Sequence, residues 1–231
     1  MLLLTWALSP WGCLAASLEV VTEDSSYSYM HDGKIIGSAT EQVEASLKAA
    51  GIADYHITLY PWARAYAIAQ REASVLIYPI VRTPAREKLF KWGGQLDRIE
   101  QYLYRLRDRT HVHMQTLQEG HQYIIGVVRD DSRQEYLQSR GFSRMVVSAN
   151  NPDNFRRLLN HQVDLIPMPE REARHMCDEM HIAFEDLERV YTLDELANGL
   201  YFAFSLATPD TVVEHTRTAF EKLNQAVIKQ P

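Results

Sequence analysis

Arg86 is a residue whose type and position could bind an anionic group. A guanidinium offers a planar fork of N–H donors that fits the two oxygens of an anionic group. Arg86 follows Thr83 and Pro84, a capping residue and a proline in the order that typically starts a helix. A helix start there would add free backbone amides and a positive dipole end. The alternative is that Arg86 forms an ion pair with a nearby acid, such as Glu87 or Asp97.

Nine histidines raise the question of a metal site. His111 and His113 could present two imidazoles on one face of a strand, and His175, Cys177 and His181 cluster on one expected helix. Neither set has the spacing of a zinc site. The sequence also lacks the G-x-S-x-G, H-E-x-x-H and phosphate-binding glycine-loop motifs. We therefore expect no metal and no cofactor.

The composition is that of an ordinary globular protein. The 231 residues are 46% hydrophobic and 23% charged, with a formal net charge of −6. The 24 lysines and arginines are scattered, whereas nucleic-acid-binding proteins concentrate them on one face. The sequence therefore argues against a nucleic-acid partner. The acidic balance does not exclude an anionic ligand, because one placed arginine can dominate a cleft.

The first 16 residues resemble a secretory signal. Residues 1–16 are apolar, contain no Asp, Glu, Lys or Arg, and end in small residues before a strand-like stretch begins at Leu18. They are too short to span a bilayer comfortably. The alternative, a buried N-terminal helix, is disfavoured by Pro10 and Gly12. Cleavage near Ala16 would remove Cys13 and leave Cys177 alone, so no internal disulfide is expected.

Short apolar stretches alternate with amphipathic ones along the rest of the chain, which indicates α/β architecture. Ser38 and Glu41 have the spacing of a capping box at a helix start. The expected strands are residues 18–23, 56–59, 74–80, 123–128, 145–148, 163–167 and 200–205. Helices are expected to start at Ser38, Pro61, Thr83-Pro84, Asp131, Asn151-Pro152 and Thr208-Pro209.

These elements fall into two groups with no Gly/Ser-rich linker between them. We expect two α/β lobes joined by two extended crossings, with a ligand cleft between the lobes. After the signal, the first lobe is expected to cover residues 17–104, the second 105–192, and the return to the first lobe 193–231.

Four stretches together resemble a known family, the extracellular solute-binding proteins of family 3, which are the amino-acid-type receptors of ABC importers. The resemblance covers essentially the whole chain after residue 16. The stretches are Val20–Glu23 with Tyr27-Ser28-Tyr29 and Gly37; Leu59–Tyr66; Arg82–Glu87 with Phe90-Lys91-Trp92; and Ile125–Arg129 with Val163–Ile166.

The resemblance implies a type II periplasmic-binding-protein fold with the ligand held between the lobes. The family's T-x-x-R arginine grips the ligand carboxylate, and that position is Arg86, behind Thr83. The loop formed by Arg129, Asp130, Asp131 and Ser132 lies where the family binds the other side of a carboxylate, and Arg129 is expected to face the ligand. The alternative for this loop is simple helix capping by Asp131.

The resemblance also assigns the walls of the cleft. Tyr27, Tyr29 and Trp62 would be its aromatic walls, although aromatic residues of this kind can equally be core. Arg64 follows Trp62 and would reach either the cleft or solvent. The acid that holds an α-ammonium group should fall near residue 169, where Glu170 is the close candidate. A free α-amino acid and another small carboxylate-bearing or polar solute both remain open as ligands.

Three functional classes fit these observations. The first is a periplasmic, monomeric solute-binding protein without catalytic activity, which closes on its solute through a hinge and presents it to the membrane permease of an ABC importer. The second is a dehydratase-like enzyme on the same scaffold, with Glu23 or Glu170 as the proton-transfer group. The third is a sensory module that acts on a signalling partner. The first is our expectation.

Overall fold

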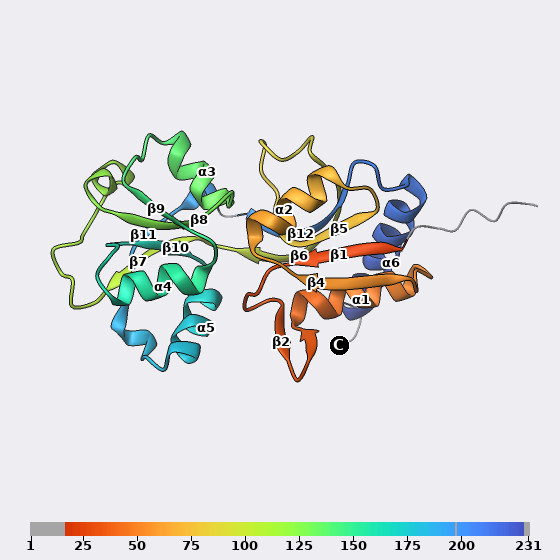
Figure 1. The fold of residues 1–231 in the computed structure, drawn as a ribbon, viewed down its shortest axis with the longest axis horizontal. Helices are drawn as coiled ribbons and strands as arrows, with labels where there is room; N and C mark the ends of the chain where they lie inside the picture. The colour runs from red at the N-terminus through yellow and green to blue at the C-terminus, as the bar shows by residue number, and fades with distance from the viewer. Residues whose placement is uncertain (1–16, 197, 229–231) are drawn as a thin grey trace, which may run out of the picture.

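The first lobe is built on a five-stranded sheet, seen on the right of the computed structural model, which describes residues 17–196 and 198–228 (Figure 1). The expected signal segment lies outside the described residues. The strands are β1 (Leu18–Thr22), β4 (Tyr55–Leu59), β5 (Val75–Val81), β6 (Phe90–Ile99) and β12 (Asn198–Ser205), in the order β4-β1-β5-β12-β6. β4, β1 and β5 are parallel, and β12 runs antiparallel to both β5 and β6.

Helices cover both faces of this sheet. α1 (Ser38–Ala49) and α6 (Asp210–Ile228) pack on one face, and α2 (Trp62–Arg71) packs on the other. Successive side chains of β5 enter opposite cores: Leu76 and Tyr78 face α1 and α6, whereas Val75 and Ile77 face α2. Burial on both faces explains why this strand is apolar without interruption.

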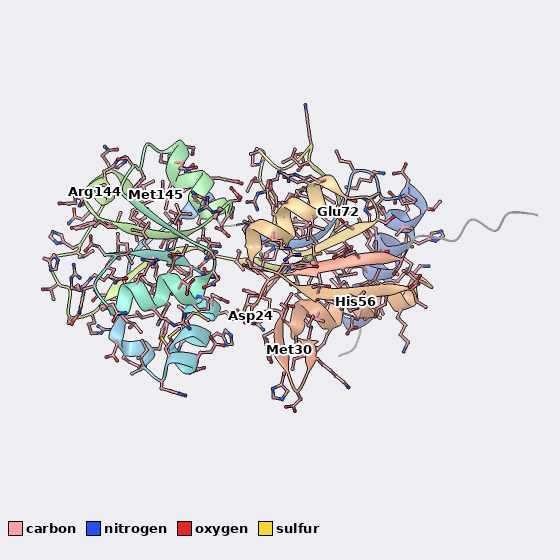
Figure 2. The ribbon with its side chains drawn as sticks, in the orientation of Figure 1. Asp24, Met30, His56, Glu72, Arg144 and Met145 are labelled. Carbon is pink, nitrogen blue, oxygen red and sulfur yellow. The ribbon has the colours of Figure 1, made fainter. Side chains whose placement is uncertain are left out.

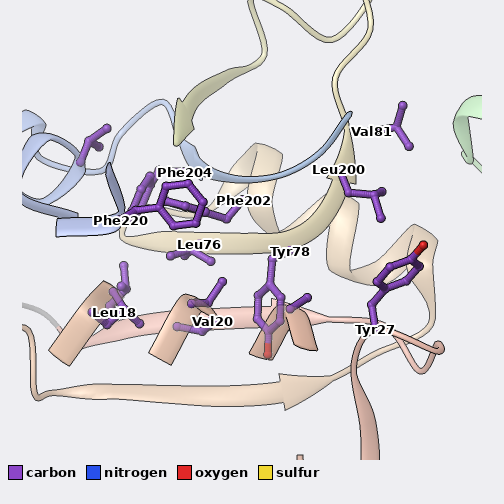
Figure 3. Close-up of a cluster of buried hydrophobic side chains, with 14 of the residues drawn as sticks. Leu18, Val20, Tyr27, Leu76, Tyr78, Val81, Leu200, Phe202, Phe204 and Phe220 are labelled. Carbon is purple, nitrogen blue, oxygen red and sulfur yellow. The ribbon is translucent and has the colours of Figure 1, made fainter. Parts of the chain in front are cut away.

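The core between the sheet and α1 and α6 extends to the cleft. Phe202, Phe204 and Phe220 pack edge to face at one end of it. Figure 3 shows the cluster continuing to Tyr27 and Val81 at the end that faces the second lobe. The same hydrophobic layer therefore stabilises the lobe and supports the cleft wall. A hairpin of β2 (Tyr29–His31) and β3 (Lys34–Ile36) projects beside it.

The second lobe repeats the arrangement of the first. β7 (Tyr102–Leu106) lies between β10 (Ile166–Met168) and β11 (Leu187–Thr192), and β8 (Ile125–Val128) pairs with β9 (Met145–Ser148). A bridge between Ile125 and Leu165 joins β8 to the β10 side. The helices are α3 (Ser132–Ser139), α4 (Asn151–Leu159) and α5 (Glu170–Met180), with short 3-10 helices at Leu117–Gln122, Phe184–Asp186 and Asp194–Leu196.

The chain crosses between the lobes twice. The chain crosses once between β6 and β7 and again between β11 and β12, and the Leu193 amide donates to the Gln101 carbonyl at 2.8 Å where they run together. The expected boundary between the two lobes, between residues 104 and 105, falls inside β7. This strand pairs with β10 and β11 of the second lobe. No helix among residues 17–196 and 198–228 is long and apolar enough to cross a membrane.

Most expected helix starts are confirmed, and two expectations about them are wrong. Asp131 caps α3 by accepting from the Arg133 amide. The helix expected at Thr83-Pro84 is absent, because residues 84–89 form consecutive turns that lead directly into β6. The helix-dipole contribution expected for Arg86 is therefore absent too.

The expected capping box at Ser38 is also absent. Ser38 is the first residue of α1, and the N-cap is Gly37, which makes no side-chain cap. Gly37 has φ +126°, and a Cβ there would lie 2.4 Å from the carbonyl oxygen of Tyr27. Glycine is required at this position because the chain turns tightly against the loop that carries Tyr27.

Candidate functional site

A small cavity lies between the lobes, next to the crossing segments. Its volume is about 50 Å³. Figure 2 marks its place by Asp24, which lies between the lobes and follows the cavity residue Glu23 in sequence. The lining residues are Glu23, Ser25, Tyr27, Trp62, Pro79, Val81, Arg86, Ile99, Gln101, Asp131, Ser132, Arg133, Asn151, Pro169, Glu172 and Leu200. Both lobes contribute residues to this lining, so the cavity lies at the interface between them.

Arg86 enters the cavity from the turn that precedes β6. Its side chain is 1% exposed, and its guanidinium lies over the rings of Trp62 and Tyr66 at 5.5 and 4.8 Å. Nη2 donates to the Asp130 carbonyl at 2.9 Å and to Oε1 of Glu135 at 3.0 Å, both in the second lobe. Arg86 therefore forms an ion pair with Glu135, and not with Glu87 or Asp97, the two acids named in the ion-pair alternative.

The Asp130 carbonyl joins the two lobes at this point. It accepts from Arg86 and also from Nε1 of Trp62, at 2.8 Å. Asp130 has φ +58°, in the left-handed region that non-glycine residues adopt at a cost of about 1–2 kcal/mol. This conformation, together with a bond from its amide to Gln134 Oε1, fixes the carbonyl towards the first lobe.

Asp131 and Arg133 form a buried ion pair at the start of α3. Nε of Arg133 lies 2.6 Å from Oδ1 of Asp131, Nη2 lies 2.9 Å from Oδ2, and Nη1 donates to the Pro167 carbonyl. Burial alone would raise the pKa of Asp131, but the adjacent guanidinium outweighs it and holds this pKa below its ordinary value. Asp131 therefore stays ionised and neutralises Arg133 locally.

Glu23 follows β1 and presents its carboxyl group to the cavity. Burial, together with the negative charges of Asp131 and Glu172, raises the pKa of Glu23 to about 8, and the positive charge of Arg133 opposes this rise. The shift arises because removing this carboxyl from water beside other acids disfavours its charged form. Glu23 thus holds a proton near neutral pH unless a cation enters the cavity.

Glu172 approaches Glu23 from the first turn of α5. The side chain is 2% exposed; Oε2 accepts from the Ser26 amide at 2.9 Å, and Oε1 accepts from Nδ2 of Asn151 at 3.3 Å. Both donors are uncharged, so they solvate the carboxylate without cancelling its charge. The cavity is consequently acidic at the Glu23–Glu172 side.

The structure brings half of the expected site residues to the cavity. Those lining it are Tyr27, Trp62, Arg86, Asp131 and Ser132. Tyr29, Arg64, Thr83, Arg129 and Glu170 do not line it. Two of the latter have other surroundings: Arg64 is exposed with its guanidinium 4.3 Å over the Tyr60 ring, and Glu170 pairs with Arg174 and Arg189.

Several cavity residues were not singled out from the sequence as ligand-binding. From the sequence, Glu23 is expected only as a proton-transfer group, and Arg133, Asn151 and Glu172 have no expected role, yet all four line the cavity. Glu172 lies two positions after Glu170, the acid expected to hold an α-ammonium group, and of the two only Glu172 lines this cavity. Within the described ranges, no group of three or more His, Cys, Asp and Glu residues is arranged to hold a metal ion.

Comparison with known proteins identifies the fold. No family model and no curated protein matches the chain. A histidine kinase sensor domain with similarity to periplasmic binding proteins superposes with a TM-score of 0.80 at 16% identity, covering 92% of each chain. ArtJ, an arginine-, lysine-, histidine-binding protein from Geobacillus stearothermophilus, gives 0.78 at 18% identity over 91% of this chain and 90% of that one. This chain has the periplasmic-binding-protein fold.

A third structure of this fold was solved with a ligand. It is AbpA, an amino acid ABC transporter substrate-binding protein from Streptococcus pneumoniae bound to L-arginine, with a TM-score of 0.76 at 17% identity over 91% of this chain and 90% of AbpA. The expected class of two α/β lobes is confirmed by these likenesses. The cavity described above lies between the two lobes of this fold.

Proposed function

We propose that this protein is a non-enzymatic solute-binding protein, which encloses a small amine-bearing solute between its lobes. The observation that carries the proposal is the charge left uncompensated in the cavity. Asp131 neutralises Arg133, and Glu135 neutralises Arg86, which leaves the carboxyl groups of Glu23 and Glu172. A cation beside both groups would offset the charge of Glu172 and favour the ionised form of Glu23.

An amino or amidino group matches this arrangement. Such a group offers several N–H donors and a full positive charge, and it would keep Glu23 ionised by displacing its proton. ArtJ is an arginine-, lysine-, histidine-binding protein and AbpA was solved with L-arginine, and both facts support a cationic solute of amino-acid size. The carboxylate that we expected at Arg86 would have to share that guanidinium with Glu135.

Solute capture is proposed to use closure of the lobes. The cavity of about 50 Å³ is well below the roughly 300–1,000 Å³ of ordinary small-molecule sites, so an amino-acid-sized solute enters after the lobes separate. Reclosing around the solute would then create the surface that a partner recognises. We propose the membrane permease of an ABC importer as that partner, and a periplasmic or extracellular location for the complex.

A thermal-shift series tests the solute class. Agmatine, L-arginine, cadaverine and succinate are added to the purified protein at increasing concentration. We expect the amines to raise Tm progressively and succinate to leave it unchanged, because a solute that prefers the folded state stabilises it. Unchanged Tm with every amine would overturn the proposal.

Two variants locate the effect in the cavity. Glu172→Gln removes a buried charge that faces the solute, and we expect it to reduce the amine-induced shift. Glu72→Gln is the control, because Glu72 is exposed at the end of α2, away from the second lobe (Figure 2). A shift lost equally in both variants would contradict the assignment of Glu172.

A sensory role is the second candidate. It is supported by the likeness to a histidine kinase sensor domain and by contacts that join the lobes with protein atoms alone. A permease gene beside this one would favour transport, and a histidine kinase gene would favour sensing.

A further inference from the structure

Arg86 is already bound to a carboxylate of the opposite lobe. We propose that Glu135 is a built-in carboxylate that occupies Arg86 when the lobes close, so that closure needs no solute and solutes that require Arg86 for a carboxylate are excluded. The exclusion rests on the proposed function, whereas the solute-free closure rests on the cross-lobe contacts alone.

The contact uses the donor atom that faces the second lobe. Nη2 of Arg86 has two hydrogens, and the Asp130 carbonyl and Glu135 accept them at 2.9 and 3.0 Å. Nη1 turns back to the Val81 carbonyl at 3.5 Å, inside its own lobe. A solute carboxylate could therefore reach Nη2 only by displacing a group of the protein.

The burial of the two partners differs sharply. The Arg86 side chain is 1% exposed, whereas that of Glu135 is 37% exposed at the edge of α3. A buried guanidinium needs a counter-charge, because leaving it unpaired costs several kcal/mol. Glu135 can supply that charge from the rim and can withdraw into water when the lobes separate. The pair thus favours the closed arrangement and is reversible.

A second set of contacts holds the other side of the cavity. The Ser26 amide donates to Glu172, and the Ser26 carbonyl accepts from Nη2 of Arg171 at 3.0 Å. With the Arg86 contacts, these bonds connect the lobes on both sides of the small cavity. Every partner in them belongs to the chain itself, so the closed form has its own stabilising contacts.

The chain offers a matched control for Glu135. Glu188, on β11, pairs with Arg105, on β7; their side chains are 39% and 7% exposed, and the N–O distance is 2.7 Å. Both residues lie in the second lobe. Glu188→Gln therefore removes the same type of ion pair as Glu135→Gln, without touching the contact between the lobes.

Small-angle X-ray scattering of the solute-free protein tests closure. We expect a compact two-lobed particle for the wild type and Glu188→Gln, and a larger radius of gyration for Glu135→Gln. Circular dichroism of each variant establishes that both lobes remain folded. An open wild type, or a folded Glu135→Gln protein as compact as the wild type, would overturn the conformational part of the proposal.

Titration calorimetry with L-arginine and agmatine tests the exclusion. Agmatine is arginine without its carboxylate, so the pair isolates that group. We expect wild type and Glu188→Gln to favour agmatine, and Glu135→Gln to gain about tenfold or more in affinity for L-arginine, with agmatine affinity little changed. Equal L-arginine affinity in wild type and Glu135→Gln would refute the exclusion. Failure of the wild type to bind either compound would instead refute the proposed function and the exclusion that rests on it, while scattering still decides closure.

Discussion

The carboxylate of Glu172, at the start of α5, accepts a 2.9 Å hydrogen bond from the backbone amide of Ser26 in the opposite lobe. Glu172 therefore serves two purposes. Its bond to Ser26 holds the lobes together, and its carboxylate brings a negative charge to the cavity. Because Ser26 uses its backbone, this contact does not depend on the serine side chain. It depends on where α5 starts and on how the loop after β1 turns.

Arg171→Ala should loosen this side of the closed form. Arg171 donates to the Ser26 carbonyl, and its guanidinium lies 4.5 Å over the Tyr27 ring. We expect faster hydrogen–deuterium exchange of the amides at Ser26 and Tyr27 in the variant, because their loop loses a contact from the second lobe. Arg174→Ala is the control, since Arg174 contacts Glu170 and Phe184 within the second lobe. Equal exchange in the two variants would show that Arg171 does not hold the loop.

Stability should fall with rising pH because of Glu23. Its pKa is about 8 in the folded protein, raised mainly by burial, against an ordinary value of 4.5. Between these values the folded chain holds a proton that the unfolded chain has released. The contribution is full below about pH 4.5 and is lost as pH rises towards 8, by up to about 1.4 kcal/mol per pH unit.

Urea unfolding of wild type and Glu23→Gln between pH 5.5 and 8.5 measures this effect. The amide does not titrate, so the variant should lack the Glu23 part of the decline. Parallel pH profiles in the two proteins would contradict the raised pKa.

Gly37→Ala should destabilise the first lobe by about 2–3 kcal/mol or more. The position has φ +126°, which side chains disfavour, and the added Cβ would meet the Tyr27 carbonyl oxygen at 2.4 Å. Gly33→Ala separates the two causes, because Gly33 has φ +74° and nothing within 4 Å of a Cβ. We expect about 1 kcal/mol there. Similar unfolding free energies for the two variants would mean that the loop around Tyr27 shifts to accommodate the added Cβ.

Asp131→Ala should cost more stability than the loss of an ordinary helix cap. Asp131 caps α3 and also neutralises the buried Arg133, so its removal leaves an unpaired charge at a cost of about 3–5 kcal/mol. Asn150 caps α4 by accepting from the Asp153 amide, and Asn150→Ala should cost about 1 kcal/mol. Chemical unfolding of both variants gives the comparison, and equal losses would assign Asp131 a capping role alone.

Local signals in the sequence predict the architecture well. The uninterrupted apolar stretch at β5 indicated a strand buried on both faces, and Asp131 and Asn151-Pro152 lie at the starts of α3 and α4. Thr83-Pro84 has the same local signal and makes only turns, because the chain must reach β6 within a few residues. A capping residue followed by proline describes how a helix can start, and the distance to the next strand decides whether it continues.

The candidate site is less predictable for a physical reason. Arg86 and Glu135 are 49 positions apart and in different lobes, and the pairing of Ser26 with Glu172 spans 146 positions. Helix and strand periods indicate which way a side chain points from its own element, but not what it meets across a cleft. Arg86 could therefore be named as a site residue, while its partner could not.

The position of β12 determines the order in which the two lobes can be completed during synthesis. This strand lies between β5 and β6 in the first sheet, yet residues 198–205 come after the whole second lobe. Among the described strands, β6 pairs with β12 alone. During synthesis, one edge of β5 and the paired edge of β6 therefore stay without a strand partner until residues 198–205 have been made. The second lobe needs no such late strand. A prematurely ended chain would thus carry a complete second lobe beside an incomplete first lobe, whose unpaired strand edges favour aggregation.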